Sequence, residues 1–123
     1  MYCYKKISAV VDCRITVNTD ALIAQMEGGL LFGFSTALYE EINIKDGRIE
    51  QSNFHNYPIM CINDAPPIDV HITKITENPG SIGEVSTTAA FPSLGNALFN
   101  AIGKRCKRYP FSPHFLMEIV SRF

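Results

Sequence analysis

Residues 22–38 read LIAQMEGGLLFGFSTAL, and apolar side chains recur in this stretch at every fourth position. The repeating residues are Leu22, Met26, Leu30, Phe34 and Leu38. Side chains four residues apart share one face of an α-helix, so the pattern predicts an amphipathic helix with a buried face. Asn18 precedes the pattern and is suited to cap the start of this helix, because its side chain can accept a backbone N–H of the first turn.

Three glycines interrupt this apolar helix, at positions 28, 29 and 33. Each glycine inside a helix lowers the stability of the helix by about 0.5–1 kcal/mol relative to alanine. Three glycines in one helix therefore indicate a structural or functional requirement. Gly29 and Gly33 fall on one face of the helix and leave it flat. Either another helix or a sheet packs closely on that face, or a cofactor lies against it.

Strand patterns occur on both sides of the helix. Residues 7–11 are short, apolar and rich in β-branched side chains, which is typical of a buried strand. Residues 41–51 alternate around an Asp-Gly dipeptide, which is typical of a tight hairpin turn. Residues 68–75 alternate again and are predicted to form a half-buried strand.

A second helix is predicted after the loop at residues 78–83, and it runs to about residue 104. Leu94 lies in its apolar stripe, and Gly103 is placed to cap its end. The tail at residues 115–120 favours one more short helix.

Helices interspersed among strands indicate an α+β fold. We therefore expect a single domain over residues 1–123. The expected architecture is a small mixed sheet of about four strands, including one hairpin, packed against two main helices.

The composition excludes several classes of protein. The chain has 123 residues, of which 46% are hydrophobic and 19% charged, and its net charge is -1. This balance supports a packed core and gives no electrostatic basis for binding nucleic acid. No apolar run reaches the roughly 18 to 20 residues that span a bilayer, and the N-terminus lacks the pattern of a signal peptide. We therefore expect no membrane association. The sequence leaves the compartment open between cytoplasm and periplasm, with the cytoplasm as the default.

The four cysteines are Cys3, Cys13, Cys61 and Cys106. None belongs to a Cys-x-x-Cys pair or has the spacing of a zinc or iron–sulfur site, so the sequence predicts no metal ligands. An even number would allow two disulfides in a secreted chain. Because nothing else in the sequence indicates secretion, free thiols are favoured.

Glu84 is the candidate reactive residue. It follows the loop Gly80-Ser81-Ile82-Gly83 and precedes the second helix. A carboxylate at a loop-to-helix junction, flanked by small residues, can be reached by a ligand. The alternative is that Glu84 only caps the helix or favours its dipole, which contributes under about 1 kcal/mol.

Four blocks of sequence together resemble one enzyme family. They are residues 25–41 (QMEGGLLFGFSTALYEE), 52–57 (SNFHNY), 83–84 (GE) and 95–105 (GNALFNAIGKR). Their order and spacing are similar to the C-terminal part of the large, molybdopterin-binding subunit of molybdenum hydroxylases, the xanthine dehydrogenase and aldehyde oxidase family. The resemblance is closest to proteins like the isoquinoline 1-oxidoreductase β subunit, and it covers roughly residues 5–110.

The resemblance implies a molybdenum ion held by the dithiolene of a pterin, with no protein ligand to the metal. It implies the cytosine dinucleotide form of molybdopterin and the hydroxylation of an aldehyde or an N-heterocycle. By position, Glu84 matches the family's general base, which takes a proton as oxygen attacks the substrate. Gln25, Gly28, Gly29 and Gly83 match positions that border the cofactor.

A large subunit of this family is several-fold longer than this chain. The resemblance therefore implies two partners, the remainder of the large subunit and a [2Fe-2S] small subunit. We expect the isolated chain to bind no cofactor and to turn over no substrate. The alternative is a non-catalytic α+β module, standalone or decayed, that covers exposed apolar faces by forming a homo-oligomer.

The chain departs from the family pattern at three places. Arg14 directly follows Cys13 where the family has a glycine, and Thr19 stands where the family has a proline. Val85 follows Glu84 where proline and glycine are frequent. These positions lie near the expected edge of the cofactor.

Overall fold

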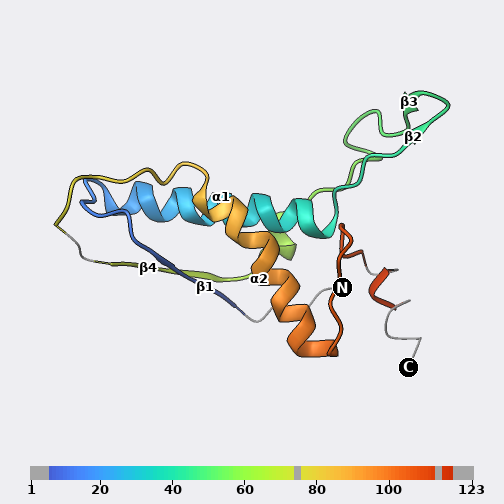
Figure 1. Cartoon of the computed structure of the whole chain (residues 1–123). Coiled ribbons are helices and arrows are strands. Elements are labelled where there is room, and N and C mark those ends of the chain that lie inside the picture. Colours follow the sequence, from blue (N-terminus) through green and yellow to red (C-terminus); the bar gives the residue numbers. More distant parts are fainter. Residues whose placement is uncertain (1–5, 74–75, 113–114, 118–123) are drawn as a thin grey trace.

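The computed structural model describes residues 6–73, 76–112 and 115–117, and its central element is the helix α1 (Thr19–Leu38). Asn18 caps this helix as predicted, because its side-chain oxygen accepts the N–H of Ala21 at 3.0 Å. All five residues of the apolar stripe are buried. Figure 1 shows α1 running along the body of the molecule with the other elements around it. The predicted amphipathic helix is confirmed.

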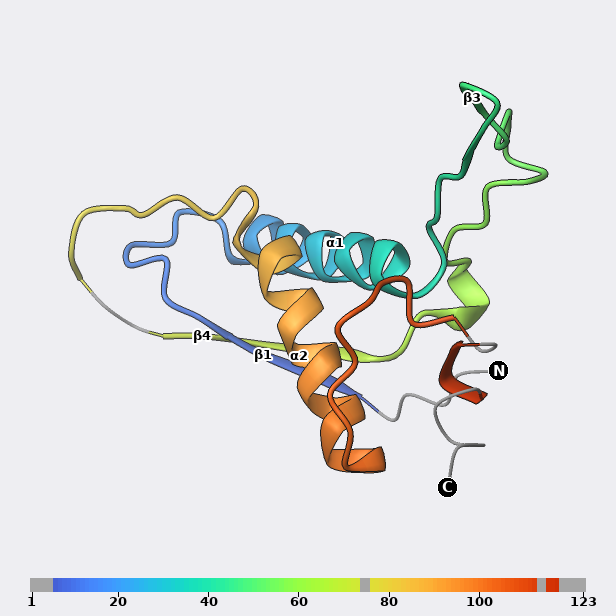
Figure 2. The same ribbon diagram turned by 45° about the vertical axis from the view of Figure 1, so that its right-hand side comes forward.

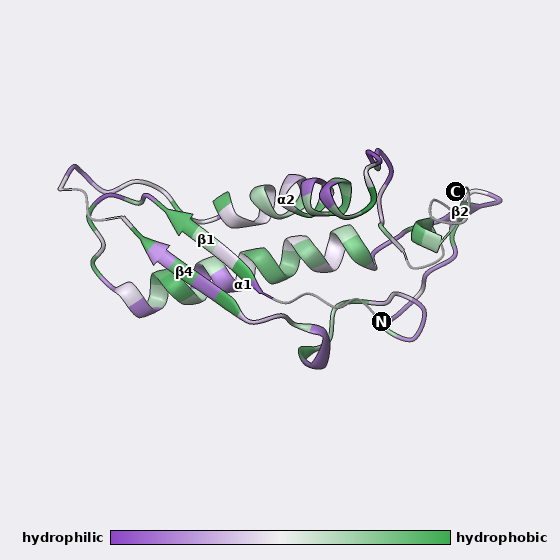
Figure 3. Ribbon diagram, turned by 90° about the horizontal axis from the view of Figure 1, so that it is seen from below, coloured by the Kyte–Doolittle hydropathy of each residue, from purple (hydrophilic) through white to green (hydrophobic). Residues whose placement is uncertain are grey.

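Two parallel strands lie on one side of α1. β1 (Ile7–Val11) pairs with β4 (Ile68–Ile72), with Ala9 opposite Val70 at the centre of the pair. Alternate side chains of both strands pack in the core with α1, among them Ala9 and Val11 of β1 and Val70 and Ile72 of β4. Figure 3 shows the two strands side by side next to α1. The strand predicted at 68–75 begins where expected and ends at Ile72, and residues 74–75 lie outside the described part of the chain.

The predicted hairpin forms a separate sheet. β2 (Ile44–Lys45) pairs antiparallel with β3 (Arg48–Ile49). Both turn residues have positive φ, 51° at Asp46 and 74° at Gly47, as a tight hairpin requires. Figure 1 shows that this hairpin stands on an arm, residues 41–59, that leaves the body beyond the end of α1. The α+β class is confirmed, but its four strands lie in two sheets because the arm carries the hairpin away from β1 and β4.

The second helix, α2 (Val85–Ile102), crosses α1 (Figure 2). It ends at Gly103, whose φ of 70° is the left-handed conformation of a glycine cap. Pro92 lies inside this helix rather than at its start. A short 3-10 helix (Ile62–Asp64) precedes β4, and residues 115–117 are helical. The rest of the helix predicted at 115–120 lies outside the described residues.

The core is built on α1. One cluster joins the C-terminal half of α1 to α2, through residues that include Phe34, Leu38 and Leu94. The other joins the N-terminal half of α1 to the two strands. Phe111, which the sequence analysis did not single out, is fully buried in the first cluster, and its N–H donates to Ala37 O at 2.8 Å. The chain after α2 therefore returns to close the core.

Among the described residues, α1 is long and apolar enough to cross a membrane by length and composition. The core helix of a globular protein passes the same test. The apolar stripe of α1 packs on the sheet and on α2, so the fold already accounts for its apolar character.

Candidate functional site

The structure brings together three of the predicted site residues. Gln25 lies on α1, whereas Gly83 and Glu84 lie where the loop after β4 enters α2. The Gln25 Nε2 atom donates a hydrogen bond to the carbonyl oxygen of Gly83 at 2.6 Å. This bond joins α1 to the residue before Glu84. Residues far apart in the sequence thus form one candidate site.

The flat face of α1 explains how α2 comes so close. A Cβ atom at Gly29 would collide with Ser86 Oγ. A Cβ atom at Gly33 would lie 2.6 Å from Ala90 Cβ and 2.7 Å from the carbonyl oxygen of Thr87. Helix-on-helix packing, one of the two alternatives, therefore accounts for Gly29 and Gly33. The close approach sets the start of α2 beside Gln25.

Gly28 and Gly83 border open space. A Cβ atom at either position would meet no atom within 4 Å. Both residues are exposed, and so are Gln25 and Glu84. All four residues are therefore accessible to solvent. That Gly28, Gly29 and Gly83 border a cofactor stays a prediction.

Glu84 occupies the N-cap position of α2, but its side chain makes no capping hydrogen bond. Its backbone φ is -127° and ψ is 1°. The carboxylate is therefore held at the helix start by the backbone and is not engaged in capping. The structure therefore shows no capping hydrogen bond from Glu84, whereas a contribution to the helix dipole and a role toward a ligand both stay predictions.

A cavity of about 260 Å³ lies next to Gln25. Its wall consists of the loop before α1, the first turns of α1 and the loop at 80–82. The two loops are joined by the Gly80 N–H, which donates to Cys13 O at 3.1 Å. Cys13 is buried, and its Sγ is 3.0 Å from Thr16 Oγ1. The loop that leads to Gly83 and Glu84 is therefore tied to the loop before α1.

Arg14, one of the departures from the family pattern, adopts a left-handed conformation with φ of 63°. Side chains other than glycine rarely adopt this conformation, which gives a reason for the glycine in the family. Two contacts compensate here. The Arg14 N–H donates to Asp12 Oδ1 at 3.0 Å, and its guanidinium lies 3.5 Å from a carboxylate oxygen of Glu77.

The site fits a pterin cofactor in its chemistry. The Gln25 carboxamide provides a polar group that can match the N–H and C=O edges of a pterin ring. The missing side chains at Gly28 and Gly83 leave space beside it. In the described part of the chain, no group of three or more His, Cys, Asp or Glu side chains is close enough to hold a metal ion. A metal at this site would need ligands from a cofactor or another chain segment.

Sequence reasoning did not find the polar cluster at the base of the arm. Glu40 accepts hydrogen bonds from Ser35 Oγ at 2.7 Å, from Thr36 Oγ1 at 3.1 Å and from the Tyr57 hydroxyl at 3.0 Å. The Met60 N–H donates to Ser35 Oγ at 3.0 Å. The hydrogen bond to Glu40 raises the pKa of Tyr57 above its usual value. This cluster fastens both ends of the arm to α1.

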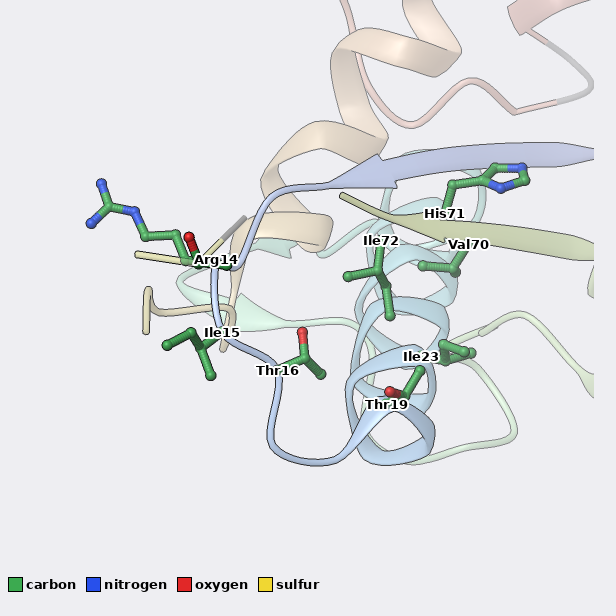
Figure 4. Close-up of a pocket in the computed structure, with 9 residues that line it drawn as sticks. Arg14, Ile15, Thr16, Thr19, Ile23, Val70, His71 and Ile72 are labelled. Atoms are coloured by element: carbon green, nitrogen blue, oxygen red, sulfur yellow. The ribbon is translucent and has the colours of Figure 1, made fainter. Parts of the chain in front are cut away.

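A second, larger cavity of about 620 Å³ lies between β4, the start of α1 and the loop at 14–16 (Figure 4). It was not predicted either, because its walls come from segments far apart in the sequence. The His71 side chain is exposed at the edge of the cavity, and its Nε2 atom lies 3.3 Å from a carboxylate oxygen of Asp69.

Comparison with known proteins identifies the family. The model of the molybdopterin cofactor-binding domain matches residues 2–66. The chain belongs to this family. It is 37% identical over 109 residues to the membrane-bound aldehyde dehydrogenase (pyrroloquinoline-quinone) of Gluconacetobacter polyoxogenes, which covers 89% of this chain and 14% of that protein. It is 29% identical over 108 residues to the isoquinoline 1-oxidoreductase subunit beta of Brevundimonas diminuta, which covers 88% of this chain and 14% of that protein.

Solved structures show the same fold. Quinoline 2-oxidoreductase from Pseudomonas putida 86 matches with a TM-score of 0.78 and 19% identity, over 89% of this chain and 15% of that chain. Reconstituted CO dehydrogenase from Oligotropha carboxidovorans matches with a TM-score of 0.81 and 18% identity, over 92% of this chain and 15% of that chain. The expected molybdenum hydroxylase family is therefore confirmed, and the chain spans about one seventh of its curated relatives.

Proposed function

We propose that this chain is the C-terminal part of the large subunit of a molybdopterin-dependent hydroxylase and that it supplies the general base, Glu84. The observation that carries the proposal is the joined pair Gln25 and Gly83, which sets an exposed carboxylate at the start of α2. The family match supports a molybdopterin-binding role. The bound molybdopterin would supply the oxidation chemistry, the hydroxylation of an aldehyde or an N-heterocycle.

Each residue has a distinct role in this proposal. The Glu84 carboxylate oxygen accepts the proton released as oxygen attacks the substrate carbon. Gln25 holds Gly83 through its Nε2 and presents the other side of its carboxamide to the pterin. Gly28 and Gly83 leave room for the cofactor, and Gly29 lets α2 approach close enough to complete this edge of the site.

The chain acts with two partners, the remainder of the large subunit and a [2Fe-2S] small subunit. The arm supports the first, because it exposes several large apolar side chains. They include Ile42, Ile44, Ile49, Phe54 and Ile59, with Ile44 74% and Phe54 84% exposed. Exposed apolar side chains gathered on one segment are typical of a contact with another protein segment. The isolated chain would have no catalytic activity and no bound cofactor.

The cofactor is proposed to be molybdopterin in its cytosine dinucleotide form. The protein itself is proposed to be cytoplasmic. Pyrroloquinoline quinone, which the name of one relative mentions, is the competing cofactor. The second functional candidate is a non-catalytic module that covers the exposed arm by forming a homo-oligomer.

Metal and cofactor analysis separates these candidates. The chain is co-expressed with the isoquinoline 1-oxidoreductase subunit beta of Brevundimonas diminuta from which the matching segment has been removed, together with its small subunit. The proposal predicts molybdenum and a fluorescent pterin in the purified complex. A complex that contains quinone and no molybdenum, or a chain that only self-associates, would contradict the proposal.

A further inference from the structure

The outer edge of β4 has backbone groups directed away from the sheet. The Ile7 N–H donates to Pro67 O at 3.0 Å, and the Thr73 N–H donates to Val11 O at 2.9 Å. The backbone N–H and C=O groups of successive residues point to opposite edges of a strand. These two bonds therefore show that the odd-numbered residues of β4 direct their N–H and C=O groups toward β1. The even-numbered residues therefore direct their N–H and C=O groups outward. These are Ile68, Val70 and Ile72.

The cavity of about 620 Å³ lies along this edge. Val70 and Ile72 of β4, Ile23 of α1 and Ile15 of the preceding loop give it an apolar lining. Figure 4 shows Val70 and Ile72 directed into the space next to Ile23. Among the described residues, no other strand pairs with this edge, so an open backbone edge and the apolar groove lie side by side.

Such an edge is unusual in a complete domain. Parallel strands are normally covered on both faces and belong to larger sheets, and an isolated pair of strands is marginally stable. Exposed edges are usually blocked by lysine, proline or a bulge. The residues of β4 whose backbone groups point to the outer edge are Ile68, Val70 and Ile72 instead. The charged Asp69 lies on the outer face of the sheet, where its carboxylate is 2.8 Å from Lys6 Nζ.

We propose that an extended segment of the remainder of the large subunit pairs with the outer edge of β4 and sets alternate apolar side chains in the groove. The inference rests on the proposed function and names the surface on which that partner binds. This chain spans 14% of the length of two relatives, so most of a large subunit remains to provide such a segment. Addition of a strand to an open edge gives affinity through backbone bonds and specificity through side-chain pockets.

A single extended strand suits this edge better than a second copy of the chain. Thr19 and Ile23 of α1 line the groove next to β4. A second copy that paired its own β4 here would also have to place the start of its own α1 beside this groove, whereas an extended strand without a helix behind it would not.

Hydrogen exchange of the assembled complex tests the inference. The chain is mixed with the Brevundimonas diminuta subunit from which the matching segment has been removed, and amide exchange is compared with that of the chain alone. The Val70 and Ile72 amides should exchange about tenfold or more slowly in the complex, whereas Asp69 and His71, which face β1, should change less. A complex in which Val70 and Ile72 exchange as in the free chain overturns the inference and leaves the proposed function standing. Failure to form any complex contradicts both.

A pair of variants at Val70 separates backbone pairing from side-chain packing. Val70→Pro removes an outward N–H and leaves the bonds between β1 and β4 in place, so it should weaken the complex about tenfold. Val70→Thr keeps the N–H and a similar shape, and should bind within about threefold of the parent chain. Equal binding by both variants overturns the inference. If Val70→Pro does not fold, the exchange experiment on the unmodified chain decides.

Discussion

Gln25 Nε2 and the carbonyl oxygen of Gly83 lie 2.6 Å apart and join two segments separated by 58 residues in the sequence. The bond fixes the loop immediately before Glu84 to the central helix. The position of the proposed general base therefore depends on a side chain of α1 as well as on α2.

Removing this bond should loosen the loop before α2. In Gln25→Ala, the Gly80 amide, which donates to Cys13 O in the same loop, should exchange about fivefold faster, because a hydrogen bond contributes about 1 kcal/mol. The measurement is hydrogen exchange followed by NMR. The matched control is Gln51→Ala, whose side chain bonds the Asn43 N–H on the arm. Unchanged exchange of the Gly80 amide in Gln25→Ala would show that the bond does not hold the loop.

The glycines of α1 should respond differently to alanine. Gly33→Ala forces a Cβ atom against Thr87 O and Ala90, so it should lower the free energy of unfolding by about 2–3 kcal/mol. Gly28→Ala meets no atom within 4 Å and should raise it by about 0.5–1 kcal/mol through helix propensity. Urea denaturation measures both. Equal effects of the two substitutions would contradict the packing described for the flat face.

A Cβ atom at Gly29 would collide with the Ser86 side chain, so a second substitution at Ser86 should relieve part of the clash. Gly29→Ala should destabilise the chain by about 1–3 kcal/mol because its Cβ meets Ser86 Oγ. Ser86 Oγ is buried and has no hydrogen-bond partner among the described residues, so Ser86→Ala removes the obstacle at little cost. The double variant should therefore be more stable than Gly29→Ala. Additive losses in the double variant would count against this contact.

The left-handed conformation of Arg14 predicts a stabilising substitution. Arg14→Gly relieves a backbone conformation that costs an ordinary residue about 1–2 kcal/mol. It gives up the exposed ion pair with Glu77, which contributes less. We expect a net gain of about 0.5–1 kcal/mol in thermal or urea denaturation, after the entropy of glycine in the unfolded chain is included. A loss of stability would mean that the Arg14 side chain holds the loop more firmly than its exposure indicates.

The stability that the Tyr57–Glu40 hydrogen bond gives to the base of the arm should decrease at alkaline pH. The hydrogen bond to Glu40, with smaller contributions from burial and from the Glu40 charge, raises the pKa of Tyr57 above its usual value of 10.0. The folded chain therefore keeps this proton when the unfolded chain has lost it. The stabilisation is fully present below pH 10.0 and is lost as the pH rises through the folded-state pKa.

NMR titration of the Tyr57 ring measures this effect. Glu40→Gln should lower the pKa of Tyr57 toward the usual value, whereas Glu50→Gln, also on the arm, should leave the pKa unchanged. A Tyr57 pKa that is the same in all three proteins would rule out the bond to Glu40 as its cause.

The periodic elements were predictable from sequence, but their partners were not. The spacing of Leu22, Met26 and Leu30 identified the core helix, and the Asp-Gly dipeptide identified the hairpin turn. The flat face at Gly29 and Gly33 was also recognised. Whether a helix or a cofactor covers that face depends on a contact with Ser86 and Ala90, which local sequence does not determine.

The same limit applies to the site. Glu84 was identified by its junction between loop and helix and by a family resemblance, and Gln25 by the resemblance alone. The bond from Gln25 to Gly83 requires the packing of α2 on α1, so no local pattern predicts it. Ser35 and Tyr57 resemble ordinary surface residues in the sequence, and only the return of the arm to α1 brings them to Glu40. Phe111 is buried for a similar reason, because the chain folds back after α2.

The most direct test of the central claim is the activity of the assembled enzyme with and without the Glu84 carboxylate. The chain is assembled with the Brevundimonas diminuta subunits described above, and dye reduction is measured with an N-heterocycle and with an aldehyde. The Glu84→Gln complex should contain as much molybdenum as the parent complex but lose about 100-fold or more in rate, the usual contribution of a general base. Glu50→Gln, on the arm, should remain active. A Glu84→Gln complex with full molybdenum content and unchanged turnover would contradict the account.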